Sequence, residues 1–157
     1  MKKILSFLCL AALLLSATCL AQDDYQGRIK IIVEQLGRAQ GFLKTNKINL
    51  PEYEQWYNAF KPLSEEFVRD FSKSHRQKES FRLIKEGFNG FALAWTSLEQ
   101  ARKADEQYRE AITLNDVAYA YKWKDSVASR RKDADEQIAK GLEFVRQSLK
   151  TAEEETQ

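Results

Sequence analysis

The chain has 157 residues, of which 43% are hydrophobic and 31% are charged, with 25 Lys and Arg against 23 Asp and Glu. This near balance argues against a general affinity for nucleic acid or for an anionic membrane, which usually shows as an excess of basic residues on one face. The length corresponds to one domain and is sufficient for a hydrophobic core.

The first 21 residues have the pattern of a secretory signal peptide. Lys2 and Lys3 precede an apolar run over residues 4–16, and Cys19-Leu20-Ala21 places small residues at the −3 and −1 positions of a cleavage site before Gln22. An uncleaved membrane anchor is the alternative, although the apolar run barely reaches the ~20 residues needed to span a bilayer. We therefore expect export to the bacterial periplasm or to the cell exterior.

Cys19 also allows a second processing route, because lipoprotein signals end at a cysteine that becomes lipidated. The protein would then be anchored in the envelope, and membrane attachment is expected only in this case. Ordinary cleavage removes Cys9, Cys19 and the one methionine, so the mature chain has no thiol and depends on packing for its stability. It also removes two basic residues and no acidic ones, which leaves formally equal charges.

Apolar residues recur at helical spacing through most of the chain, so residues 22–152 are predicted to form a single all-α domain. A first helix is expected from about Asp24 to Asn46. The next begins after Asn49, a candidate cap, with Pro51 in its first turn, where a missing N–H costs little. Pro62 lies inside this second helix and is expected either to kink it or to split it. The predicted apolar face comprises Tyr53, Trp56, Tyr57, Phe60, Leu63, Phe67 and Phe71.

A third periodic stretch starts near Gln77 and carries an aromatic stripe in steps of three and four: Phe81, Ile84, Phe88, Phe91, Trp95 and Leu98. A break is predicted at residues 113–116, where Asn115 is expected to end one helix or cap the next. The last helix is predicted to bury Val117, Tyr121, Val127, Ala134, Ile138, Leu142, Val145 and Leu149. Residues 153–157 are predicted to be a disordered acidic tail, because their charges oppose the helix dipole.

These helices favour an antiparallel bundle of about four helices. A short array of helical hairpins is the alternative, because the segment 102–107 recurs as 131–137, each with a tryptophan upstream. Residues 85–118 also resemble a tetratricopeptide repeat, with first-helix and second-helix positions occupied by Phe88, Phe91, Ala92, Trp95, Ala104, Tyr108 and Ala111. The resemblance implies a scaffold that binds peptide segments in a groove.

The sequence offers no pattern that would carry catalysis or bind a cofactor. His75 is the one histidine, so neither a Glu-x-x-His pair for a di-iron centre nor a Cys-x-x-Cys-His motif for covalent haem is present. Gly87 and Gly90 lie in the helical stripe, where close packing explains them better than a phosphate-binding loop does. The basic stretch 122–132 is interrupted by Asp125 and is interpreted as a solvated helix face. We therefore expect no enzyme, no cofactor and no metal.

Aromatic residues are the remaining candidates for function. They either fill the core or line a groove or cavity between helices, and the candidate lining residues are Trp56, Tyr57, Phe88, Trp95 and Trp123. The favoured hypothesis is interaction with another envelope protein or peptide. The alternative is a binder of a small apolar ligand.

Overall fold

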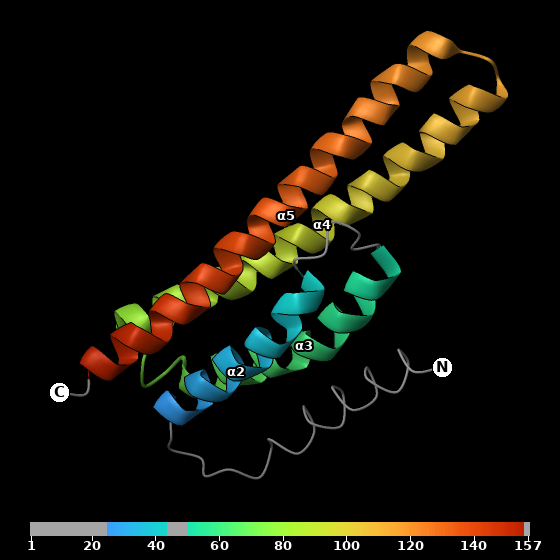
Figure 1. Ribbon diagram of the computed structural model, residues 1–157. Coiled ribbons are helices and arrows are strands. Elements are labelled where there is room, and N and C mark those ends of the chain that lie inside the picture. The colour runs from blue at the N-terminus through green and yellow to red at the C-terminus, as the bar shows by residue number, and fades with distance from the viewer. Residues whose placement is uncertain (1–24, 44–49, 156–157) are drawn as a thin grey trace.

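The computed structural model describes residues 25–43 and 50–155, and these form an all-α bundle of four helices (Figure 1). The helices are α2 (Tyr25–Leu43), α3 (Leu50–Phe71), α4 (Glu79–Thr113) and α5 (Val117–Glu154). The predicted signal peptide, residues 1–21, lies outside the described residues.

The two long helices, α4 and α5, form an antiparallel hairpin that is about twice as long as the rest of the bundle (Figure 1). Helix α2 packs mainly on α5, and α3 packs mainly on α4. Both short helices lie beside the half of the hairpin that contains the C-terminus. The other half projects away from them and ends at the α4–α5 turn, so the bundle has a packed base and a free distal arm.

Small residues at intervals of seven allow α4 and α5 to pack closely. Both helices bury such a series on the facing sides, namely Ser80, Gly87, Ala94 and Ala101 on α4 and Ala134, Gly141 and Ser148 on α5. A seven-residue apolar period is typical of helices that coil around each other. The backbones come so close that a Cβ placed at Gly90 would lie 2.9 Å from the carbonyl oxygen of Gln137.

The turn between the long helices confirms the predicted break. It also shows which residue ends α4 and which residue caps α5. Asn115 has φ 56°, and the N–H groups of Asn115 and Asp116 donate to the carbonyl oxygens of Ile112 and Ala111, which ends α4 in a Schellman motif. Asp116 then caps α5 by accepting from the backbone N–H of Tyr119 at 3.0 Å. Asn115 therefore ends one helix, and its neighbour caps the next.

Pro62 does not split the second helix, because α3 is continuous from Leu50 to Phe71. The proline and Asn58, whose carbonyl would receive the missing hydrogen bond, are both on the exposed side of α3. Water can satisfy that carbonyl, so the lost bond does not break the helix.

Helix α4 contradicts the hairpin-array alternative. The segment 85–118 that resembles a tetratricopeptide repeat lies mostly in one helix, which passes without interruption through residues 99–102, where a repeat would turn. The two copies of the internal echo fall on different long helices and do not form equivalent hairpins.

The acidic C-terminus also differs from the prediction. Helix α5 continues through Glu154, and the Glu155 carboxylate accepts hydrogen bonds from the backbone N–H and the hydroxyl of Ser80, at 3.1 and 2.6 Å. This contact with the start of α4 offsets the unfavourable charge at the helix end. Residues 156–157 lie outside the described residues.

Candidate functional site

Four of the five candidate aromatic residues lie where α3 packs against α4. The indole of Trp56 stacks on Phe60, with ring centroids 5.2 Å apart, and only 4% of Trp56 is exposed. Phe88 is 8% exposed and meets Phe60 edge to face at 5.5 Å. Both therefore belong to the core, which is the simpler of the two interpretations of the aromatics.

Tyr57 and Trp95 lie at the margin of this core. Both are half-buried, and their rings stack with centroids 6.1 Å apart and planes 14° from parallel. Burial, together with the nearby charge of Glu65, raises the pKa of Tyr57. The hydroxyl therefore remains protonated at neutral pH and can donate a hydrogen bond.

Trp123 is separated from the other four candidates, because it lies on the distal arm of α5. Its ring meets Tyr119 edge to face at 5.7 Å, and its buried indole N–H has no acceptor among the described residues. The five candidates do not form one site, since the length of the hairpin places Trp123 far from the α3–α4 contact.

An open groove of about 440 Å³ runs between α3 and α4 beside the aromatic cluster. Its apolar lining comes from Tyr57, Val68, Phe88 and Ala92, and its polar lining comes from Lys61, Ser64, Glu65, Arg69, Lys85 and Asn89. We call this the α3–α4 groove. Two of the candidate residues line it, Tyr57 and Phe88, whereas Trp56 and Trp95 do not.

The charged lining of the α3–α4 groove is mainly basic. It comprises three cations and one carboxylate, and Glu65 pairs with Lys61 at 3.7 Å. Arg69 pairs outside the lining with Asp70 at 3.1 Å, and the Lys85 ammonium has no ion pair among the described residues. These basic residues were not singled out from the sequence, because only the packing of α3 on α4 places them along one groove.

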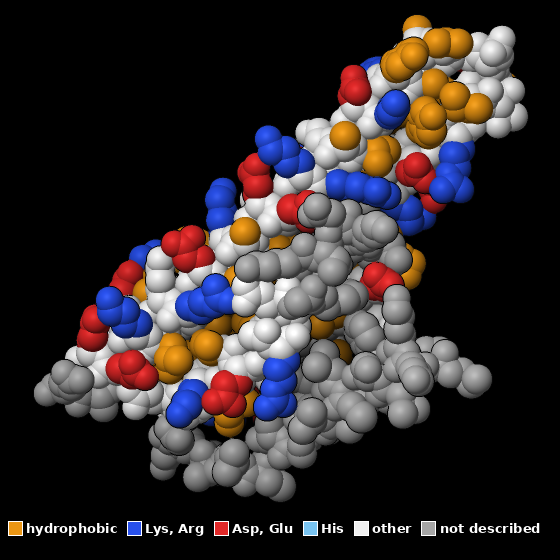
Figure 2. Space-filling model, in the orientation of Figure 1, with side chains coloured by type: hydrophobic (Ala, Val, Ile, Leu, Met, Phe, Trp, Pro, Cys, Tyr) orange, Lys and Arg blue, Asp and Glu red, His pale blue; other side chains and the backbone are white. Residues whose placement is uncertain are grey.

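A second feature is an exposed apolar surface at the distal end of the hairpin, which we call the hairpin tip. Figure 2 shows hydrophobic side chains gathered around this end. Its members and their exposed fractions are Ile112 56%, Leu114 71%, Val117 59%, Tyr119 43% and Tyr121 62%.

The exposure of Val117 and Tyr121 corrects the prediction that the last helix buries them. Near the hairpin tip, α4 is the only described helix that α5 meets, because the two short helices lie at the base (Figure 1). The side facing α4 is occupied by Ala120, which is 4% exposed. A two-helix contact buries a narrower stripe than a four-helix core, so residues beside that stripe remain in solvent.

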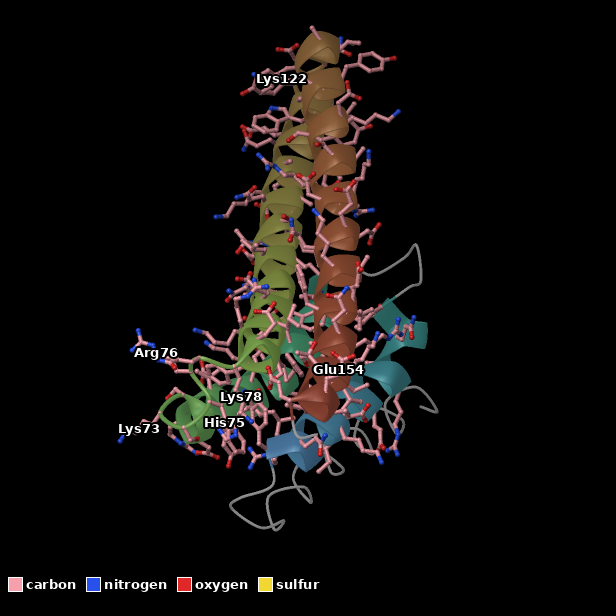
Figure 3. All side chains as sticks on the ribbon, turned by 90° about the vertical axis from the view of Figure 1, so that its left-hand side faces the viewer. Lys73, His75, Arg76, Lys78, Lys122 and Glu154 are labelled. Atoms are coloured by element: carbon pink, nitrogen blue, oxygen red, sulfur yellow. The ribbon has the colours of Figure 1, made fainter. Side chains whose placement is uncertain are left out.

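The histidine lies at the base, at the opposite end from Lys122 (Figure 3). The His75 ring stacks on Tyr25 with centroids 4.0 Å apart, and the Tyr25 hydroxyl shares a 2.9 Å hydrogen bond with Ser80. Burial raises the pKa of Tyr25 to about 12, with a smaller opposing effect of Ser80, so this hydroxyl stays protonated. These contacts hold the start of α2 against His75, in the loop between α3 and α4, and against Ser80 of α4. Their role is therefore structural.

Neither a metal centre nor a membrane span is found in the part of the chain that the structure describes. No three His, Cys, Asp or Glu side chains of residues 25–43 and 50–155 are grouped so as to hold a metal ion. Within the same residues, no helix is both long enough and apolar enough to cross a bilayer. Comparisons with family models, with curated proteins and with solved structures found no match to this chain.

Proposed function

We propose that this protein is exported to the bacterial periplasm or the cell exterior and acts there without catalysis, by binding a protein or peptide in the α3–α4 groove. The observation that supports this proposal is the groove itself, which combines an apolar floor with a mainly basic rim. An open groove between two helices can accept a helical or extended peptide segment whose apolar side chains enter it.

The rim indicates the charge of the partner. Lys85 has no ion pair among the described residues. Lys61 pairs with Glu65, which is the single carboxylate that lines the groove. A peptide that carries acidic residues next to its apolar side chains would complement this rim, and complementary charge directs both orientation and partner choice. The same groove suits a small apolar ligand poorly, because it is open to solvent, whereas such ligands are usually enclosed by the protein.

Site-specific photo-crosslinking in the host tests this proposal. A photoreactive residue in place of Asn89 is expected to capture one discrete protein, whereas the same residue in place of Lys140, which is exposed on α5, captures none. Lys85→Glu is expected to lower the Asn89 adduct about tenfold by opposing acidic groups of the partner. The matched charge reversal Lys140→Glu should leave the adduct unchanged.

Three results would contradict the proposal. Adducts could spread over many proteins, they could form equally at Lys140, or Lys85→Glu could leave them unchanged. A small molecule retained in native mass spectrometry, without any protein adduct, would favour the ligand-binding alternative. Intact mass of the protein from the host envelope tests export, because a chain beginning at Gln22 is expected and a lipidated Cys19 would contradict free release.

A further inference from the structure

The hairpin tip exposes apolar side chains on opposite sides of the same helix. Tyr119 and Tyr121 are 43% and 62% exposed, and two residues along an α-helix are about 200° apart around its axis. Leu114, 71% exposed, lies between the helices at the turn. A flat protein surface can cover only one of these sides. An environment that surrounds the tip is needed to cover them together.

The area of the hairpin tip is small for a protein interface. With about 200 Å² for a fully exposed large side chain, its five members leave roughly 600 Å² in solvent. A stable protein–protein interface buries about 800 Å² on each partner. The hairpin tip is nevertheless at the upper end of the apolar patches that monomeric proteins expose, and such patches are commonly functional.

The chemistry of the hairpin tip is that of a membrane interface. Lys122 and Lys124 are exposed and have no ion pair among the described residues, and the Lys122 ammonium lies 5.7 Å from the ring centre of Tyr119 and 5.8 Å from that of Trp123. Tyrosine and tryptophan concentrate at the boundary between lipid headgroups and acyl chains, and lysine extends from there to the phosphates.

The charges of the hairpin tip are balanced in number, as in the chain as a whole, but its two lysines have no ion pair among the described residues. Between residues 112 and 125 the acidic side chains are Asp116 and Asp125, against Lys122 and Lys124. The Asp116 carboxylate accepts the backbone N–H of Tyr119 at the start of α5, where the helix dipole offsets its charge. The lysines are therefore free to meet anionic lipid.

We propose that the hairpin tip inserts into the interfacial layer of an anionic phospholipid bilayer. Leu114 enters furthest, Tyr119 and Tyr121 lie on either side at headgroup depth, and Lys122 and Lys124 contact lipid phosphates. This surface is distinct from the α3–α4 groove, which lies at the base. It provides a route to the membrane that requires neither a spanning helix nor a lipid on Cys19.

Co-sedimentation with vesicles tests this inference on the protein purified from its host, with its N-terminus checked by mass. Binding is expected to mixed phosphatidylglycerol–phosphatidylcholine vesicles and to be about tenfold weaker with phosphatidylcholine alone, because two lysines lose their anionic partners. The variant Leu114→Ser/Tyr121→Ser should bind the mixed vesicles at least roughly tenfold more weakly than the unchanged protein. The control Leu93→Ser removes an equally apolar side chain that is 53% exposed away from the tip, and should bind normally.

Fluorescence quenching locates the contact independently. Lipids with brominated acyl chains are expected to quench the emission of Trp123, and Trp123→Phe should abolish this quenching while vesicle binding is retained. Equal binding of the Ser variant and the unchanged protein, quenching that persists in Trp123→Phe, or no vesicle binding at all would each overturn the inference. Circular dichroism verifies that the variants are folded. Failure here would leave the Asn89 crosslinking result unaffected, since the two surfaces are tested separately.

Discussion

Because α4 and α5 approach each other closely at Gly90, we expect a side chain added there to destabilise the protein. In Gly90→Ala the added Cβ would lie 2.9 Å from the Gln137 carbonyl oxygen and 3.1 Å from the Gly141 Cα. These neighbours are backbone atoms, so the helices themselves must separate. Overpacking of this kind costs about 1–3 kcal/mol, and the better helix propensity of alanine returns up to about 1 kcal/mol. We expect the free energy of unfolding to fall by about 1–2 kcal/mol.

Gly37→Ala is the matched control, because it makes the same chemical change in a helix where the new Cβ meets nothing within 4 Å. There only the propensity effect remains, and the free energy of unfolding should rise by about 0.5–1 kcal/mol. Urea unfolding followed by circular dichroism gives the free energy of unfolding of both variants, and the two are compared with the same dependence on urea concentration. If Gly90→Ala were also stabilising, the proposed backbone contact between the long helices would be refuted.

Three further predictions concern single groups. Tyr53→Phe should lower the free energy of unfolding by about 1 kcal/mol, because the fully buried hydroxyl donates to the Phe91 carbonyl at 2.7 Å; an unchanged urea midpoint would contradict this. Asp116→Ala should cost about 1 kcal/mol by removing the cap of α5, whereas Asp116→Asn should retain most of it. Burial, with the nearby charge of Lys78, lowers the pKa of His75 below its ordinary 6.5, so protonation favours the unfolded chain. Stability should therefore fall as the pH drops below 6.5, and melting curves of His75→Gln should lose this part of the pH dependence.

Helical periodicity allowed much of the fold to be predicted. The aromatic stripe of α4 is buried from Phe81 to Leu98 except for the half-buried Trp95, and the break near residue 115 occurs where the turn residues indicated it. Close packing at Gly87 and Gly90 was predicted and is confirmed, but the seven-residue series to which Gly87 belongs was not predicted. A hydrophobic pattern does not reveal this series, because glycine and serine add little to it, although they permit the closest approach of two helices.

The candidate site was only partly predictable. Tyr57 and Phe88 were among the candidates and line the α3–α4 groove, but the cations beside them resembled any solvated helix face. Val117 and Tyr121 were predicted to be buried because their spacing fits a buried stripe, but both are exposed. Spacing carries no information on which other helices pack beside that part of α5.

The helical class, the approximate helix boundaries and the residues able to form a core could be predicted from the sequence, since these depend on contacts between near neighbours in the chain. Which of the apolar residues are covered depends on how the helices pack. Helices α2 and α3 are about half the length of α4 and α5, and they cover only the base of the hairpin. Burial depends on the presence of a second surface, and for this reason the groove at the base and the exposed hairpin tip emerged only from the packing of the four helices.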